Sequence, residues 1–402
     1  MTVADVSVVI AVHDAMPHLA DCLASLAGQS IGAPRMEVVA VDLGSTDGSG
    51  AQLRRFAARH PGRCRILGPA AAPDGAGAPT DPLDLATAHA RGRYVCELGA
   101  DERLDAEALE RLVDAADRWG ADVVLARTAG EPPRGVRAAT AERVTFADPA
   151  LAWELSGVRF LRRELITRHG LRRRPDLAAH ADQPFGVAAL LLAGRISVLA
   201  DHEHIHPVPG AARRPGAAGC RSAAADRLRG IRAVQEVVEQ LAGPGPARDA
   251  IRGRHFGWDL PQLLQQPFLA LDGPDQAELV REIGRLVDRY CSPGLFVRLP
   301  VADRLRLALA QRGELPVLRG LIAHEAVFGP PPEVRRGGRS YAGYPVFRDA
   351  RLGLPDALFE LPGGPAVRPP GWRRLVPRQV RRSARRWRRA WRDARPAKAA
   401  GS

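Results

Sequence analysis

The run VSVVIAV at residues 6–12 decides the fold class. A continuous stretch of mainly β-branched residues is typical of a strand that is buried on both faces. After it, Pro17 opens a segment whose leucines recur at helical spacing, and a second buried run, VVAV, follows at residues 38–41. The alternation continues, with strands expected at 65–67, 94–98 and 121–126 and helices after residue 48 and at 106–118. It predicts an α/β fold with a mostly parallel sheet and helices on both faces.

The chain is expected to fall into four parts. The alternating pattern occupies residues 1–210, and residues 211–329 read as a mainly helical domain. Three consecutive prolines open a small segment at 330–370, where Gly337-Gly338 predicts a hairpin. Residues 371–402 form a basic tail in which apolar residues recur at steps of four, three and four: Val380, Ala384, Trp387 and Trp391. That spacing predicts a basic amphipathic tail helix.

Most of the net charge of +13 lies in this tail, which holds 12 basic side chains and one acid, Asp393. The rest of the chain is nearly neutral, so a body built to grip nucleic acid is not indicated. A tryptophan stripe opposite arginines favours an anionic membrane surface, and we expect peripheral association with the inner face of the cell membrane. A solvated tail and a nucleic-acid-binding arm are the alternatives.

Composition excludes several classes of chemistry. The chain has one lysine, Lys398, so a Walker-A phosphate loop, a Schiff-base enzyme and a protein kinase are ruled out. The five cysteines are widely spaced without a CxxC pair, which argues against a disulfide framework and a zinc site. The first residues read as a strand rather than a leader, and no apolar run is long enough to span a bilayer. We expect a cytoplasmic protein.

Polar residues follow the expected strands, where sheets of this kind bind ligands: His13-Asp14, Asp42 and Asp101. Four ordered blocks around them carry a family resemblance. VSVVIAVHDAMPHLADCLASLAGQ (6–29), VVAVDLGSTDGS (38–49) and ARGRYVCELGADERL (90–104) resemble the nucleotide-sugar-binding GT-A domain of family-2 glycosyltransferases. VRFLRRELITRHGLRRRPDLAAHADQPF (158–185) looks like the acceptor-side region of wall teichoic acid glycosyltransferases in that family. The resemblance covers about residues 5–210.

The resemblance implies an inverting, metal-assisted glycosyltransferase. It would move a hexosyl or N-acetylhexosaminyl group from a nucleotide diphosphate sugar, with a UDP-sugar favoured, to a cell-envelope polymer. A teichoic-acid-like glycan or another polyol-phosphate polymer is the expected acceptor. The expected cofactor is a divalent cation, Mn²⁺ or Mg²⁺, because carboxylate-bound metal stabilises a leaving diphosphate.

Particular residues take roles by this resemblance. Asp182 stands where the family places its general base, and Asp101 is the last position of the Asp-X-Asp motif that holds the metal. His202, His204 and His206 alternate, so they share one strand face, and His204 is a further metal candidate. The remaining candidates would contact the nucleotide sugar: Ala11, His13, Asp14, Asp42, Gly44, Ser45, Asp84 and Ala100. The alternatives are purely structural roles: a turn carboxylate for Asp42 and helix N-caps for Asp14 and Asp182.

The chain departs from the family pattern at several positions. Leu43, Gly99 and Ala181 stand where the family has acids, and Pro82-Leu83-Asp84 replaces an Ala-Arg-Asn block with its nucleotide-contacting arginine. Glu97 and Glu102 are the carboxylates available to compensate. The losses also support a rival hypothesis, in which a catalytically silent member of the family serves as a binding or assembly subunit.

Overall fold

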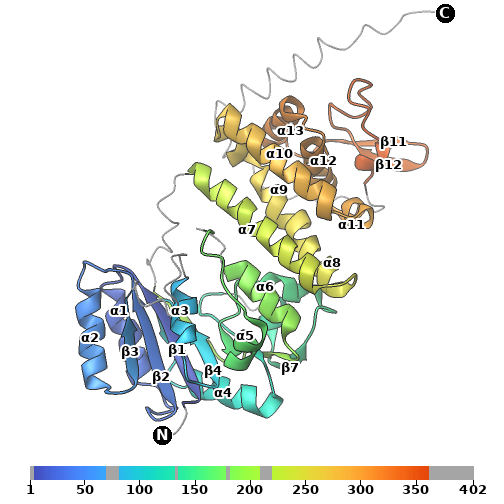
Figure 1. Cartoon of the computed structure of the whole chain (residues 1–402). Helices are drawn as coiled ribbons and strands as arrows, with labels where there is room; N and C mark the ends of the chain where they lie inside the picture. The colour runs from blue at the N-terminus through green and yellow to red at the C-terminus, as the bar shows by residue number, and fades with distance from the viewer. Residues whose placement is uncertain (1–3, 69–80, 132–134, 178–181, 209–219, 362–402) are drawn as a thin grey trace, which may run out of the picture. The chain divides into compact units, whose positions relative to one another are not determined.

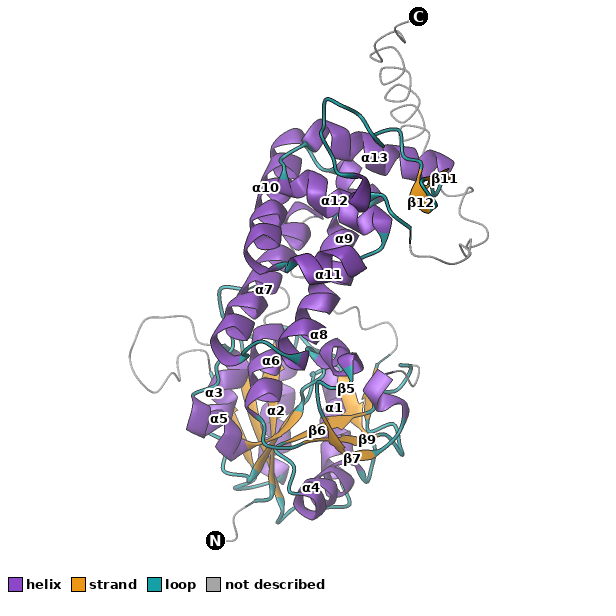
Figure 2. Cartoon of the chain, turned by 90° about the vertical axis from the view of Figure 1, so that its right-hand side faces the viewer, coloured by secondary structure: helices purple, strands orange, loops and turns teal. Residues whose placement is uncertain are grey.

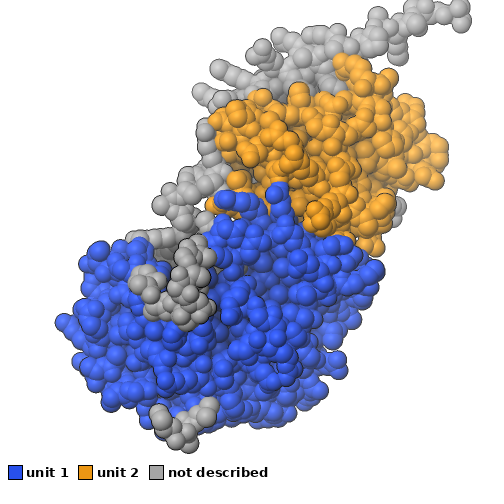
Figure 3. All heavy atoms as spheres, viewed as in Figure 1, with its two compact units in different colours: residues 1–218, 229–251 blue, residues 219–228, 252–402 orange. Residues whose placement is uncertain are grey.

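The computed structural model describes residues 4–68, 81–131, 135–177, 182–208 and 220–361. Its contacts divide the chain into two compact units, shown in blue and orange in Figure 3. Unit 1 comprises residues 1–218 and 229–251, and unit 2 comprises residues 219–228 and 252–402. The tail helix expected within residues 371–402 lies outside the described residues.

Unit 1 is built on an eight-stranded sheet with the order β3-β2-β1-β4-β8-β6-β9-β7. Figure 1 labels strands β1 to β4 and β7 of this sheet. Two further short strands, β5 and β10, pair with each other beside it. The strands are β1 (Val6–Val12), β2 (Met36–Asp42), β3 (Cys64–Leu67), β4 (Tyr94–Glu97), β5 (Glu102–Leu104), β6 (Val123–Ala126), β7 (Ala141–Val144), β8 (Phe160–Arg162), β9 (Ile196–Leu199) and β10 (Ile205–Pro207).

The expected strands at the start of the chain are present, but the sheet is mixed rather than uniformly parallel. Strands β3, β2, β1 and β4 run parallel to one another, as do β6 and β9. Strand β8 lies antiparallel between β4 and β6, and β7 is antiparallel to β9 at the edge. Strand β8 has three residues, too few for a pattern that a sequence window could detect.

Helices cover both faces of this sheet, and Figure 2 shows them in purple around the orange strands. Val8 and Ile10 of β1 belong to a core shared with α1, α2 and α4, whereas Val9 belongs to a core shared with α3, α5 and α6. This explains the uninterrupted apolar run of β1. The helices of unit 1 are α1 (His18–Ala27), α2 (Ser49–Arg59), α3 (Pro82–Ala88), α4 (Ala108–Trp119), α5 (Arg163–His169) and α6 (Asp182–Leu192).

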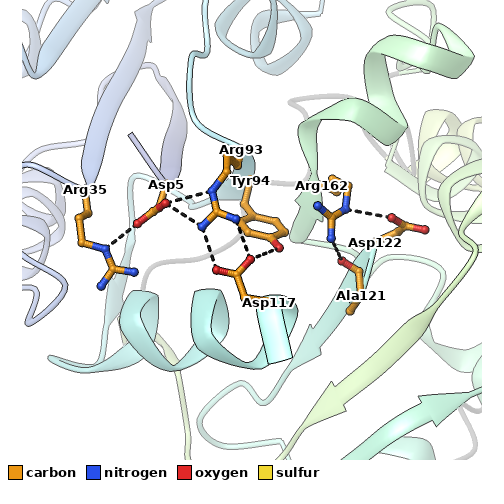
Figure 4. Close-up of polar contacts among 8 residues, drawn as sticks. All are labelled: Asp5, Arg35, Arg93, Tyr94, Asp117, Ala121, Asp122 and Arg162. Atoms are coloured by element: carbon orange, nitrogen blue, oxygen red, sulfur yellow. Dashed lines mark hydrogen bonds and ion pairs between the residues drawn. The ribbon is translucent and has the colours of Figure 1, made fainter. Parts of the chain in front are cut away.

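An ion-pair network holds the amino ends of β1 and β4 to helix α4 (Figure 4). Arg93 donates to Asp5 at 2.7 Å and, through both of its terminal nitrogens, to Asp117 at 2.7 and 2.8 Å. Arg35 adds a bond to Asp5, and the hydroxyl of Tyr94 donates to Asp117 at 2.7 Å. The network fixes the end of the sheet at which β1 and β4 begin, opposite their carboxyl ends.

The described part of unit 2 is helical apart from one hairpin. In its core, α10 and α12 approach so closely that a Cβ on Gly284 would lie 2.8 Å from the carbonyl oxygen of Ala310. The expected hairpin forms around Gly337-Gly338. Helices α7 (Cys220–Leu241) and α8 (Pro246–Arg254) each contribute residues to both units. The other elements are α9 (Leu260–Leu263), α10 (Gly273–Tyr290), α11 (Pro293–Arg298), α12 (Val301–Gln311), α13 (Leu315–Phe328), β11 (Glu333–Arg336) and β12 (Arg339–Ala342).

The sequence predicts neither a membrane-spanning helix nor a disulfide framework. Among the described helices, none combines the length and the apolar character needed to cross a bilayer. The described cysteines, Cys22, Cys64, Cys96 and Cys291, are all free thiols.

Candidate active site

A cavity of about 260 Å³ lies at the carboxyl ends of β1 and β4, which pair in parallel. This is the edge at which open α/β sheets bind ligands. The lining comes from β1, β4, the turn after β4, helix α3, the segment 155–159 and the start of α6. Its residues are Ala11, Leu83, Glu97, Leu98, Gly99, Asp101, Glu102, Leu155, Ser156, Val158, Arg159, Asp182 and Phe185.

Asp101 and Asp182, the expected metal ligand and general base, both line this cavity. Asp101 lies in the turn between β4 and β5, and Asp182 is the first residue of α6, where the helix dipole favours a carboxylate. Among the described residues, neither side chain has a hydrogen-bond or ion-pair partner. Two carboxylates from segments about 80 residues apart in the sequence are therefore available to the same ligand.

Gly99 leaves a space that two carboxylates approach. A Cβ at this position would lie 2.8 Å from Oδ1 of Asp101 and 3.0 Å from Oε2 of Glu102. Oε2 of Glu102 accepts a hydrogen bond from the backbone N–H of Gly99 at 2.8 Å. Mg²⁺ and similar hard cations are often held by one or two carboxylates together with substrate phosphates, so these residues fit a divalent cation. The described residues contain no cluster of three or more His, Cys, Asp or Glu that could enclose one.

Two arginines pair with the other acids of the cavity. Arg159 forms an ion pair with Glu102, and Arg173 forms one with Glu97. Burial raises the pKa of Glu97 more than the neighbouring Arg173 lowers it. Sequence reasoning missed both arginines. They belong to the arginine-rich block 158–174, in which nothing distinguishes the side chains that turn inward.

Asp84, expected to contact the nucleotide, is buried below the cavity surface. Its side chain is 5% exposed and forms an ion pair with Nη1 of Arg173 at 2.7 Å. Burial raises the pKa of Asp84, and the charge and hydrogen bonds of Arg173 oppose that rise. Asp84 therefore lies behind the cavity lining, where it pairs with Arg173, whereas its neighbour Leu83 lines the cavity.

The other nucleotide candidates cluster in the loops after β1 and β2, and their carboxylates brace these loops. Oδ1 of Asp14 accepts the backbone N–H of Thr46 at 2.7 Å, and this bond is the main cause of its lowered pKa. Asp14 has a positive φ of 44°. Oδ1 of Asp42 accepts the N–H of Ser45 at 2.9 Å, and the hydroxyl of Ser45 accepts the N–H of Asp14 at 3.2 Å. The two loops thus form one braced unit at the ligand-binding edge.

Four further candidates lie near this edge with different surroundings. His13 is exposed, and Gly44 has a φ of +86°, a backbone conformation that side-chain-bearing residues rarely adopt. Ala100 lies in the turn beside Asp101 but does not line the cavity. Ala11 does line it.

His204 is not brought to the cavity. Its ring is fully buried, and Nε2 lies 3.4 Å from Oδ1 of Asp201. Burial lowers the pKa of His204, which favours the neutral imidazole. The residue immediately precedes β10, which pairs with β5, and its side chain is not part of the cavity lining.

The chain matches two protein-family models. Residues 7–174 match "Glycosyl transferase family 2", and residues 225–322 match "Glycosyl transferase TarS linker domain". The first part of the chain is therefore a family-2 glycosyltransferase domain, and a domain of the TarS-linker type follows it. This agrees with the family indicated by the four sequence blocks.

Curated relatives make the comparison more specific. The chain is 28% identical over 204 residues to the poly(ribitol-phosphate) beta-N-acetylglucosaminyltransferase TarS of Staphylococcus aureus, a match that covers 50% of this chain and 35% of TarS. It is 26% identical over 207 residues to the poly(ribitol-phosphate) beta-glucosyltransferase of Bacillus spizizenii, covering 50% of this chain and 32% of that enzyme. The matches thus span about a third of the length of these relatives.

Solved structures show the same fold. The crystal structure of S. aureus TarS 1–349 in complex with UDP-GlcNAc superposes with a TM-score of 0.71 and 19% identity, covering 85% of this chain and 97% of that chain. The complex of TarS 1–349 with UDP gives a TM-score of 0.69 at 18% identity, with 85% and 96% coverage. The chain has the GT-A-like fold of these proteins, with a large mixed sheet and a helical region after it.

Proposed function

We propose that this protein transfers a sugar from a UDP-sugar to a polyol-phosphate polymer of the cell envelope, with N-acetylglucosamine and glucose as the first donors to test. The observation that carries the proposal is the shared cavity of Asp101 and Asp182 at the ligand-binding edge of the sheet. The family match supports glycosyl transfer, and the relatives named as poly(ribitol-phosphate) transferases support the donor and acceptor class.

In this proposal Asp182 is the general base and transfer inverts the anomeric centre. A base must reach the acceptor hydroxyl on the face of the sugar opposite the leaving diphosphate. The carboxylate of Asp182 is exposed, has no partner among the described residues and lines the cavity, so it is free to accept that proton. The braced loops after β1 and β2 hold the donor end of the site through Asp14 and Asp42.

Asp101 and Glu102 would hold the divalent cation beside Gly99. When bound, the cation supplies positive charge to the diphosphate as it leaves. Arg159 orients Glu102 by ion pairing and adds a positive charge to the cavity lining. His204, buried beside Asp201, is not part of this set.

We also place the protein at the inner face of the cell membrane, held there by residues 371–402. The basic residues and tryptophan stripe of this segment support the assignment, since each basic side chain near anionic lipid contributes about 1 kcal/mol.

A catalytically silent binding subunit is the second candidate. The pairing of Glu97 and Glu102 with arginines favours it, because two of the four cavity carboxylates are already neutralised within the chain.

The deciding experiment supplies purified poly(ribitol phosphate) with labelled UDP-N-acetylglucosamine or UDP-glucose and Mn²⁺, and measures label in the polymer. We expect incorporation by the natural chain and by Asp176→Asn, an exposed residue of the same segment. Incorporation that stops without acceptor and in Asp182→Asn supports the enzyme. No incorporation from either donor would support the silent subunit.

A further inference from the structure

Arg173 is a buried cation with three partners. Its side chain is 3% exposed. Nη1 lies 2.7 Å from Oδ1 of Asp84, the backbone N–H of Arg173 donates to Oδ2 of the same residue at 2.7 Å, and Nη2 pairs with Glu97. The guanidinium also lies over the ring of Phe185, 4.0 Å from its centroid. A planar guanidinium can do this because its donors form a rigid fork and its face stacks on aromatic rings.

The partners of Arg173 come from three separate segments of the cavity. Asp84 is on α3, next to the cavity residue Leu83, and Glu97 ends β4 inside the cavity. Phe185 lies one turn after Asp182 on α6 and also lines the cavity. A single buried side chain thus ties together the sheet end, α3 and the start of the helix that carries Asp182.

This arrangement also bears on the arginine missing from residues 82–84. Arg173, 89 residues after Asp84 in the chain, brings a cation to the same end of the sheet. Its guanidinium lies behind the residues that line the cavity and not in the cavity itself. With 3% of its side chain exposed, Arg173 is shielded from a ligand in the cavity, so its effect on the reaction would pass through its partners.

We propose that Arg173 is a positioning residue for glycosyl transfer, which holds the Glu97 carboxylate and, through Phe185, the α6 start with Asp182 in their working arrangement. The proposal rests on the function proposed above. It predicts that loss of Arg173 affects the chemical step more than donor binding, because the braced loops after β1 and β2 do not depend on it.

The test uses Arg173→Ala with and without added guanidinium chloride at low millimolar concentration. We expect kcat to fall by about tenfold or more while KM for the UDP-sugar changes by less than about threefold. Added guanidinium should restore part of kcat, because the truncation leaves a site that fits that ion between Asp84 and Glu97. Arg174→Ala is the matched control: this neighbour is 46% exposed and pairs with Asp176, so we expect natural kcat and no response to guanidinium.

A second measurement does not depend on activity. Hydrogen exchange of α6 amides, residues 182–192, should speed up in Arg173→Ala and slow again with guanidinium, whereas α4 amides, residues 108–119, should not change. If Arg173→Ala does not fold, the neutral triple variant Asp84→Asn, Glu97→Gln, Arg173→Met replaces it and should show the same kcat loss.

A wild-type kcat in Arg173→Ala would overturn the positioning role. The role would also be overturned if guanidinium did not restore the lost kcat and hydrogen exchange rose equally in α4 and α6. If the natural chain transfers no sugar, the proposed function fails, and the exchange comparison alone then decides whether Arg173 orders α6.

Discussion

The carboxylate of Glu102 lies against the position at which a side chain on Gly99 would begin. Oε2 of Glu102 is 2.8 Å from the backbone nitrogen of Gly99 and 3.0 Å from the position of an added Cβ. The sequence alone shows an acid missing at position 99. The structure shows that the acid three residues later fills the neighbouring space, so the cavity keeps two carboxylates beside the turn.

Gly99→Ala should therefore shift the carboxylates of Asp101 and Glu102 and weaken divalent-cation binding. The added methyl group would lie 2.8 Å from Oδ1 of Asp101, so that carboxylate has to shift, and 3.0 Å from Oε2 of Glu102, which has to give by a few tenths of an ångström. A shift of Glu102 weakens its hydrogen bond to the Gly99 N–H and its ion pair with Arg159, which should lower the unfolding free energy by about 1 kcal/mol or less. Mn²⁺ affinity measured by electron paramagnetic resonance should fall as well. Gly243→Ala, where an added Cβ meets nothing within 4 Å, is the control, and equal Mn²⁺ affinity in both variants would contradict the prediction.

Asp182→Asn should abolish transfer and leave nucleotide affinity unchanged. An amide cannot accept the acceptor proton, and general-base catalysis contributes about 10²–10⁴-fold in rate. The measurement pairs initial transfer rates with calorimetric titration of UDP and Mn²⁺. Turnover at the natural rate would remove the base assignment, and a parallel loss of UDP affinity would place Asp182 in the donor site instead.

Arg93→Met should destabilise the sheet edge shown in Figure 4 by about 1 kcal/mol at pH 7, since both Arg93 and Asp117 are partly exposed. The hydrogen bond from Arg93 is the main cause of the lowered pKa of Asp117. A lowered carboxyl pKa stabilises the folded state above the unfolded pKa of about 3.9, and the stabilisation is lost as the pH falls through the folded pKa.

Urea unfolding at neutral and acidic pH measures this effect. The difference between Arg93→Met and the wild-type protein should shrink as the pH falls below the unfolded pKa of about 3.9 and then through the lowered pKa of folded Asp117. Arg118→Met, an exposed position on the same helix, should match the natural chain throughout. A difference that stays constant down to pH 2 would assign the effect to packing rather than to ion pairing.

Deletion of residues 371–402 should release the protein from anionic vesicles. This segment holds 12 basic residues and the Trp387–Trp391 pair, and each basic residue contributes about 1 kcal/mol at an anionic surface. Co-sedimentation with phosphatidylglycerol vesicles measures it, and continued pelleting of the truncated chain would count against the tail assignment. Steeply salt-dependent DNA binding that the truncation removes would support the nucleic-acid-binding arm instead.

Much of the fold follows from local patterns in the sequence. The apolar run of β1, the leucine spacing of α1 and the Gly337-Gly338 hairpin each form where the sequence predicts them. These features depend on residues close together in the chain. The antiparallel position of β8 depends instead on pairing with β4 and β6, which no segment of three residues encodes.

In the candidate site, too, some residues could be predicted from local sequence and others depend on tertiary contacts. Asp101 follows an expected strand, and both Asp101 and Asp182 lie in blocks that resemble the family, so both could be selected from the sequence; both line the cavity. The burial of Arg173 could not be predicted, because it depends on Asp84, Glu97 and Phe185 meeting in space. Alternation alone placed His204 among the metal candidates, whereas tertiary packing turns its ring toward Asp201.

The most direct test of the central claim, that the cavity of Asp101 and Asp182 binds a nucleotide with a divalent cation, is calorimetric titration of UDP with and without Mn²⁺. The account predicts that UDP binds in the presence of Mn²⁺, that affinity falls when the metal is removed, and that Asp101→Asn loses this metal dependence. If UDP, GDP and CDP all fail to bind with Mn²⁺ present, the enzymatic account is contradicted and the silent subunit is favoured.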